Sequence, residues 1–387
     1  MMRSLDLARV AALVLVVLQS TAGHAAPPAP RAADAALDRA LSELVAMPGG
    51  PPGVIAIVQR GRSRRVHAHG VREIGQPEAP RSNDFMRIAS VAKAFSGAVA
   101  LALVDDDRLS LDDTIGRWLP ELPAAWYPVT LRQLLGHTSG IPDFTENGAF
   151  VQAFLRSLTV PLQPAELLAF VAATPLNFPP GTQYRYSNSD NIVVGLMVQA
   201  ATGSSYEAAL QAEVVKPLRL PGTSLPQGPE MPAPFIHGYD VARDGSYEDL
   251  SELSAAGWAW ASGGIVSTPT DLNRFIRGYV RGRLFGRAVR QEQRRFIPIA
   301  HSEPPGPGDN SAGLALFRYE TDCGTILGHT GNTFGFTQFA AATPDGRRSV
   351  TVSMSLQRTQ KSADWELVVF DALHAAQELA VCAALAR

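Results

Sequence analysis

The chain has 387 residues, of which 46% are hydrophobic and 18% are charged, and its formal net charge at pH 7 is −2. This is enough apolar material for one large domain or two merged lobes. The charge gives no electrostatic reason to expect a nucleic acid or an anionic membrane as a partner.

The first 25 residues have the pattern of a signal peptide. A basic start precedes an apolar run at residues 10–18, and residues 23–25 offer a small-x-small cleavage site. An uncleaved anchor is the alternative, although the run is short for a membrane span. The signal peptide predicts that residues 26–387 are exported, either secreted or periplasmic. Since no other segment is long and apolar enough to span a bilayer, we expect the mature protein not to be inserted in a membrane. We also expect it to be a monomer.

Hydrophobic periodicity predicts strands at both ends of the chain and helices between them. In chain order we expect a helix at 31–47, a β-hairpin at 54–59 and 65–69, helices at 90–103, 131–135, 164–171, 192–201, 205–215 and 270–280, strands at 313–319, 325–329, 334–342 and 349–356, and a helix at 363–384. The prediction is an α+β fold with one antiparallel sheet, from about 31–84 and 283–387, covered by terminal helices. Residues from about 85–282 form a helix-rich lobe, and we expect the chemistry in a cleft between the two.

Ser90 and Lys93 are the first candidate pair. Three residues apart on a helix, they face the same side, so the amine can reach the hydroxyl. Ser90 would stand at the helix N-terminus, which favours a developing negative charge. Lys93 can act as a base only if burial or neighbouring cations lower its pKa. Taken alone, the motif is better explained by a helix cap and a solvated lysine, and it is the position of Lys93 directly before an apolar helix face in a lysine-poor chain that favours the catalytic interpretation.

Two further motifs carry polar side chains that suit the same chemistry. Tyr186 and Asn188, two apart in an extended stretch, would enter one site together, with Tyr186 as base or proton relay and Asn188 orienting the lysine. His329, Thr330 and Gly331 are expected to end a strand that faces the substrate, with His329 helping Tyr186 to protonate the leaving group, Thr330 contacting the substrate and the glycine leaving room for a substrate backbone.

An oxyanion hole completes the candidate site. The N–H of Asn332 would join that of Ser90 to bind the oxyanion. Trp258 either belongs to the core or lines the cleft. No histidine pair has the spacing of metal ligands, so we expect no metal and no organic cofactor.

Together the motifs S-x-x-K, Y-x-N and H-T-G resemble those of the serine β-lactamases and penicillin-binding hydrolases, on the branch with class C β-lactamases and soluble D-alanyl-D-alanine carboxypeptidases. Segments 85–90, 134–141 and 258–264 also resemble segments characteristic of this family. Within the second segment, Ser139 is expected to be a turn residue and His137 to help hold the loop. The resemblance covers nearly the whole mature chain. It implies a serine hydrolase working through an acyl-enzyme, with a small peptide, ester or β-lactam as substrate.

The two cysteines, Cys323 and Cys382, are the only ones in the chain. Export would permit a bridge between them, and two unpaired thiols are the alternative. The resemblance is strongest to actinomycete-type carboxypeptidases around Cys323 and a late cysteine, and it supports the bridge.

Two departures from the family pattern affect the expected substrate. His329 stands where class C β-lactamases usually have lysine, and a histidine titrating near pH 6.5 would make acylation sensitive to pH. Phe317 stands where the carboxypeptidases have an arginine suited to a terminal carboxylate, and Arg318 should face the other way.

We therefore favour a carboxypeptidase-like enzyme acting on peptides that end in D-alanine. An esterase or D-amino-acid peptidase of the same fold is the next hypothesis, and a β-lactamase the third. A penicillin-binding sensor or scaffold with little turnover is the rival from another functional class.

Overall fold

The computed structural model describes residues 29–242, 244–359 and 364–387, so the predicted signal peptide lies outside the described residues. An eight-stranded antiparallel sheet has the order β2-β1-β12-β11-β10-β9-β8-β7, and β3–β6 and β4–β5 are two small separate ladders. The strands are β1 (Gly53–Arg60), β2 (Ser63–Gly70), β3 (Met86–Arg87), β4 (Tyr239–Val241), β5 (Tyr247–Asp249), β6 (Val266–Ser267), β7 (Ile297–Pro298), β8 (Asp309–Ala312), β9 (Phe317–Thr321), β10 (Gly324–Thr333), β11 (Phe336–Ala342) and β12 (Arg348–Met354). The predicted single sheet made from both ends of the chain is confirmed.

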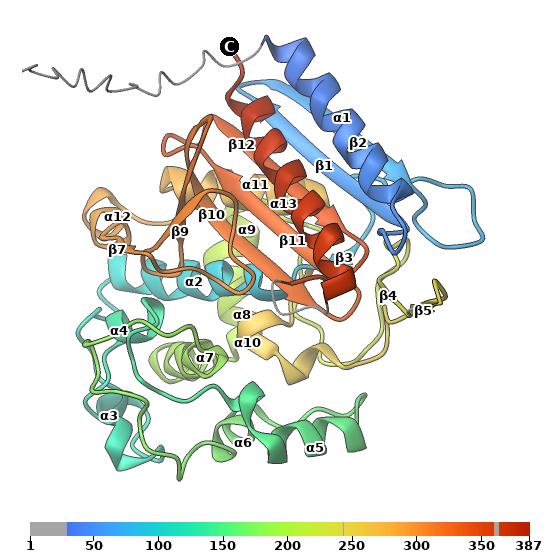
Figure 1. Cartoon of the computed structure of the whole chain (residues 1–387). Coiled ribbons are helices and arrows are strands. Elements are labelled where there is room, and N and C mark those ends of the chain that lie inside the picture. Colours follow the sequence, from blue (N-terminus) through green and yellow to red (C-terminus); the bar gives the residue numbers. More distant parts are fainter. Residues whose placement is uncertain (1–28, 243, 360–363) are drawn as a thin grey trace, which may run out of the picture.

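Helices cover both faces of this sheet. They are α1 (Pro30–Ala46), η1 (Ala89–Val91), α2 (Ala92–Asp105), α3 (Ile115–Trp118), η2 (Ala124–Trp126), α4 (Leu131–Leu135), η3 (Phe144–Glu146), α5 (Gly148–Arg156), α6 (Pro164–Ala169), α7 (Asn188–Thr202), α8 (Tyr206–Leu210), η4 (Gln211–Val215), α9 (Lys216–Leu218), η5 (Ala256–Trp258), α10 (Trp260–Gly263), α11 (Pro269–Arg281), α12 (Arg287–Gln293) and α13 (Asp364–Leu385). The terminal helices α1 and α13 lie side by side across one face, and the helix-rich middle of the chain lies beyond the other (Figure 1).

The β1–β2 hairpin shows why the sequence forms this edge of the sheet. Residues 53–59 of β1 are buried because helices cover one face and the helical lobe the other, so the strand is apolar without alternation. Gly61 supplies the left-handed turn, with φ at 58°, and Ile57 pairs with Val66. The predicted hairpin is confirmed.

One predicted strand, 313–319, is only half right. Its first four residues form the turn between β8 and β9, in which Gly313 N–H donates to the Leu316 carbonyl and Ala315 takes a φ of 49°. The strand begins at Phe317. Conversely, β10 continues to Thr333 instead of ending at His329 as predicted.

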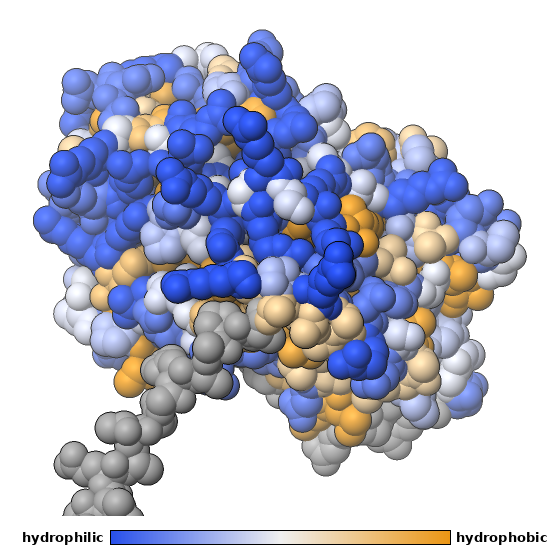
Figure 2. All heavy atoms as spheres, turned by 90° about the horizontal axis from the view of Figure 1, so that it is seen from above, coloured by the Kyte–Doolittle hydropathy of each residue, from blue (hydrophilic) through white to orange (hydrophobic). Residues whose placement is uncertain are grey.

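Helix α13 corrects the expectation that only the N-terminal run resembles a membrane segment. Its segment Leu367–Leu385 is long and apolar enough to cross a membrane by length and composition alone. In the fold, however, this helix packs on α1 and β12 and buries Val369, Leu373 and Val381 in the core. The end of the molecule seen from above in Figure 2, near the C-terminus, is mainly hydrophilic with scattered apolar patches.

The Cys323–Cys382 disulfide ties this helix to the β9–β10 turn, as predicted. The two cysteines are 59 positions apart, so the bridge restricts a long stretch of the unfolded chain. We expect the double variant Cys323→Ser/Cys382→Ser to lose about 2–5 kcal/mol of unfolding free energy. Denaturant unfolding of both proteins measures this, and identical midpoints would contradict it. Replacing both cysteines avoids a lone reactive thiol.

Candidate active site

Ser90 stands at the start of the η1–α2 helix, where β10 comes closest. Ala89, before it, holds a left-handed φ of 50°, a strained conformation for a residue with a side chain. A Cβ on Gly331 would lie 2.6 Å from the Ile88 carbonyl and 3.0 Å from the Ser90 nitrogen. Gly331 therefore allows the strand to pack against the serine backbone. This corrects our expectation that it leaves room for substrate.

Lys93 lies three residues after Ser90 on the same helix, and its side chain is completely buried. Its Nζ donates to Ser90 Oγ (3.0 Å), to Asn188 Oδ1 (2.6 Å) and to the Ser262 carbonyl (2.9 Å). Burial lowers the pKa of Lys93 to about 7, although Asp143 and other nearby carboxylates oppose the shift. The lysine is thus an amine that can be neutral near pH 7 and that touches the serine hydroxyl.

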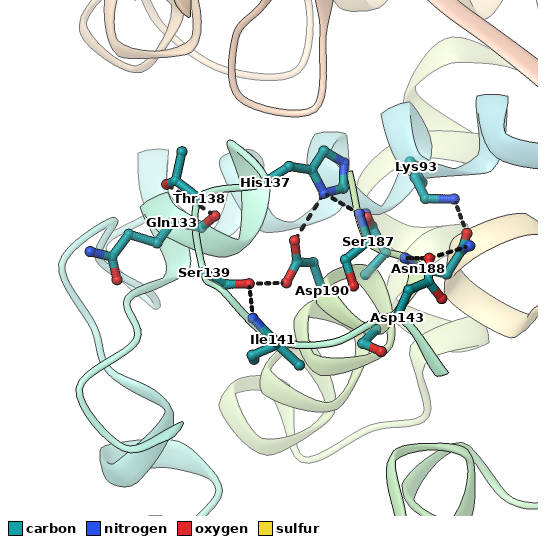
Figure 3. Close-up of polar contacts among 12 residues, drawn as sticks. Lys93, Gln133, His137, Thr138, Ser139, Ile141, Asp143, Ser187, Asn188 and Asp190 are labelled. Carbon is teal, nitrogen blue, oxygen red and sulfur yellow. Dashed lines mark hydrogen bonds and ion pairs between the residues drawn. The ribbon is translucent and has the colours of Figure 1, made fainter. Parts of the chain in front are cut away.

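Asn188 is the first residue of α7, so it is not part of an extended stretch as predicted. The Asp143 carboxylate accepts hydrogen bonds from both its backbone N–H and its side-chain Nδ2, each at 2.8 Å. With its amide nitrogen fixed in this way, Asn188 turns its oxygen toward Lys93 (Figure 3).

Tyr186 precedes α7 and presents its ring to the lysine, with Lys93 Nζ 5.0 Å from the ring centroid. Its hydroxyl is buried and makes no hydrogen bond of ordinary geometry with the described residues. Burial raises the pKa of Tyr186 well above its usual value, while the Ser90 hydroxyl acts in the opposite direction. The phenol is therefore protonated at rest, which favours a proton relay over the phenolate base that we also considered.

A second buried network holds the segment before α7. His137 Nδ1 lies 2.9 Å from Asp190 Oδ2, and Ser139 donates to the other oxygen of that carboxyl (Figure 3). Burial lowers the pKa of His137 to about 3 and raises that of Asp190 well above its usual value. Both effects favour an uncharged pair, in which Asp190 keeps its proton and Nδ1 also accepts from the Ser187 N–H. The loop role predicted for His137 is confirmed.

His329 is fully buried on β10, with its ring 6.5 Å from that of Tyr186 and edge-on to Phe317 at 5.0 Å. Burial lowers the pKa of His329 to about 3, and its Nδ1 lies 2.5 Å from the Thr330 carbonyl. The ring is therefore neutral across the physiological range. The expected titration of His329 near pH 6.5 is wrong because no water reaches the ring to stabilise its charge.

The next residues along β10 differ in what they can contact. The Thr330 hydroxyl is buried between Ser302 Oγ and the Pro304 carbonyl, so the expectation that Thr330 contacts the substrate is wrong for its side chain. Asn332, in contrast, lines the cleft beside Ser90 and donates its side-chain N–H to the Arg358 carbonyl.

Two hollows meet at Ser90. The larger, of about 400 Å³, is mainly apolar and includes Trp258 in its wall. The smaller, of about 360 Å³, contains Tyr186 and Glu303. The residues that line both hollows are Ser90, Thr145, Asn188, Asn332, Thr333 and Phe334. Such volumes are typical of small-molecule sites.

Phe317 and Arg318 lie as the strand alternation predicts. Phe317 is buried against His329, while Arg318 pairs with Glu320 and covers the ring of Phe296. Neither residue lines either hollow.

The sequence motifs missed three partners of the site, namely Asp143, Asp190 and the Ser262 carbonyl. Asp143 and Ser262 lie within or just after segments that carry the family resemblance, at 134–141 and 258–264. A buried carboxylate beside Asn188 or a backbone acceptor for Lys93 has no sequence signal, because both depend on tertiary packing.

Comparison with known proteins identifies a family and similar folds. The Beta-lactamase family model matches residues 37–373. The chain is 25% identical over 349 residues to the D-alanyl-D-alanine-carboxypeptidase/endopeptidase AmpH of Escherichia coli (strain K12), covering 86% of each chain. It is 29% identical to a D-stereospecific amidohydrolase from Streptomyces sp., with a TM-score of 0.74 over 87% of this chain and 97% of the other. The D-amino acid amidase of Ochrobactrum anthropi SV3, 22% identical, has the same fold, with a TM-score of 0.77 over 90% and 98%.

Proposed function

Because the chain belongs to the Beta-lactamase family, we propose that it is an exported serine hydrolase that cleaves amide or peptide bonds of D-amino-acid substrates through an acyl-enzyme. The observation that carries the proposal is the contact between Lys93 Nζ and Ser90 Oγ, with the amine buried and its pKa lowered. The disulfide fits export, since such bridges persist in oxidising compartments.

The proposed reaction begins with transfer of the Ser90 proton to the neutral amine of Lys93. The Ser90 oxygen attacks the substrate carbonyl, and the oxyanion lies between the N–H groups of Ser90 and Asn332. As the C–N bond breaks, Tyr186 gives its proton to the leaving nitrogen and is reprotonated by the Lys93 ammonium. Water then attacks the ester by the same route, releasing the acid and restoring Ser90.

We place a D-amino-acid amidase or peptidase ahead of a strict D-alanyl-D-alanine carboxypeptidase. The described residues that line the smaller hollow include the Glu303 carboxylate and no lysine or arginine. The family resemblance supports this order, since Phe317 stands where the carboxypeptidases have an arginine suited to a terminal carboxylate. The similarity to AmpH keeps the carboxypeptidase as the second candidate.

These candidates differ in the substrate's C-terminus. We would compare kcat/KM for a peptide ending in D-alanyl-D-alanine with that for the same peptide ending in an amide. We expect faster hydrolysis of the amide, because the described residues that line the smaller hollow include no lysine or arginine to bind a free carboxylate. Hydrolysis confined to the free acid would reverse the ranking.

The pH dependence of acylation should follow Lys93. Only the neutral amine accepts the Ser90 proton, and the pKa of Lys93 is lowered to about 7. The acylation rate should therefore fall about tenfold per pH unit well below pH 7 and level off above it. Stopped-flow acylation from pH 5 to 9 measures this. A rate still rising tenfold per unit at pH 9 would contradict the lowered pKa.

A further inference from the structure

We propose that the larger hollow binds the acyl half of the substrate and selects a large apolar side chain, aromatic or long aliphatic, on the residue whose carbonyl Ser90 attacks. This rests on the proposed function and names its substrate class. The wall of the hollow is built by aromatic rings from four parts of the chain: Phe144 of η3, Phe150 and Phe154 of α5, Trp258 of η5 and Phe334 before β11.

The position of Tyr186 indicates which half of the substrate binds in which hollow. Tyr186 lines only the smaller hollow, and in the proposed reaction it protonates the leaving nitrogen. The leaving group must therefore lie in the smaller, polar hollow. Since Ser90 and Asn332 stand between the two, the acyl group extends from the carbonyl into the larger, apolar one.

The aromatic wall is held in place before any substrate arrives. Phe154 stacks on Phe334 with ring centroids 5.6 Å apart and an interplanar angle of 5°, and it meets Trp258 edge-on at 5.6 Å. The Trp258 indole N–H donates to the carbonyls of Ser157 and Leu158 at 3.1 and 3.0 Å. A fixed wall of this kind binds an apolar group without having to be ordered first.

The rest of the hollow is lined by small apolar residues together with polar ones, among them Arg87, Thr145 and Ser254. Small side chains at Ala255, Ala256 and Ala259 leave its volume free. At its edge, Val151 and Leu155 are 39% and 62% exposed, although both are large and apolar. A bulky substrate side chain would cover the side chains of Val151 and Leu155 and remove them from water, whereas the methyl group of alanine would leave them exposed to solvent.

The test compares p-nitroanilides of D-alanine, D-leucine and D-phenylalanine. We expect kcat/KM for the two larger substrates to exceed that for D-alanine by about 10- to 100-fold, because each added carbon is buried. Phe154→Ala and Phe334→Ala should each reduce the D-phenylalanine to D-alanine ratio about tenfold. Val160→Ala, which removes an exposed apolar side chain outside the hollow, should leave the ratio unchanged.

Binding to the Ser90→Ala protein separates this inference from the proposed function. Calorimetric titration should show tighter binding of D-phenylalaninamide than of D-alaninamide, and Phe154→Ala in the same background should abolish the difference. Ser90-dependent hydrolysis of all three anilides at equal efficiency would overturn the inference and leave the proposed function standing. If the protein discriminated between the amides in binding but showed no Ser90-dependent hydrolysis, the proposed function would be wrong and the inference about the larger hollow would stand.

Discussion

Replacing Lys93 with alanine is expected to slow acylation by about 10³- to 10⁴-fold, because no other neutral base touches the Ser90 hydroxyl among the described residues. The amine is completely buried and holds three hydrogen bonds that converge on the site. Pre-steady-state acylation kinetics measure the loss. The same variant should also lose the rise in rate through pH 7.

Two further variants make this result interpretable. Lys93→Met keeps the length of the buried side chain, so a similar loss with an unchanged melting temperature excludes misfolding as the cause. Lys216→Ala removes an exposed lysine on α9 and should change nothing. A Lys93→Ala protein that acylates within tenfold of the native rate would exclude Lys93 as the base.

Tyr186→Phe should slow turnover by about 10²- to 10³-fold without reducing stability. The missing hydroxyl is buried and makes no hydrogen bond of ordinary geometry with the described residues, so its removal leaves little unsatisfied. Steady-state kcat and the denaturant midpoint measure the two effects.

Tyr184→Phe is the matched control for this substitution. It removes a hydroxyl only two positions away, one that donates to the His301 carbonyl at 2.6 Å. We expect this control to lose about 0.5–1.5 kcal/mol of unfolding free energy while keeping its rate. If both variants kept full activity, the relay through Tyr186 would be wrong.

Within each motif the sequence alone brings the site residues together, because the spacings are short, whereas the meeting of the three motifs in one site was an inference from the family resemblance. Ser90 and Lys93 meet through one helical turn, and the segment that carries Tyr186 and Asn188 brings both to the lysine. The role of Gly331 could not be predicted, since its neighbour is the backbone of Ser90, far away in the chain. The charge state of His329 likewise depends on burial by other elements.

The fold was predictable where hydrophobic patterns are long. The β1–β2 hairpin and helix α13 follow their predicted ranges closely. The turn at residues 313–316 was predicted as strand because its apolar side chains are buried by tertiary contacts, which periodicity does not distinguish from strand burial.

The most direct test of Ser90 as the nucleophile is an intact-mass time course of the mature protein with excess benzylpenicillin, beside its Ser90→Ala variant. We predict that the native protein gains the mass of one drug molecule and that the variant gains none. The substitution removes only a hydroxyl, so both proteins should melt at similar temperatures. An adduct of equal size on the Ser90→Ala protein would contradict acylation at Ser90, whereas no adduct on either protein, with the drug left unconsumed, would indicate a pocket closed to β-lactams.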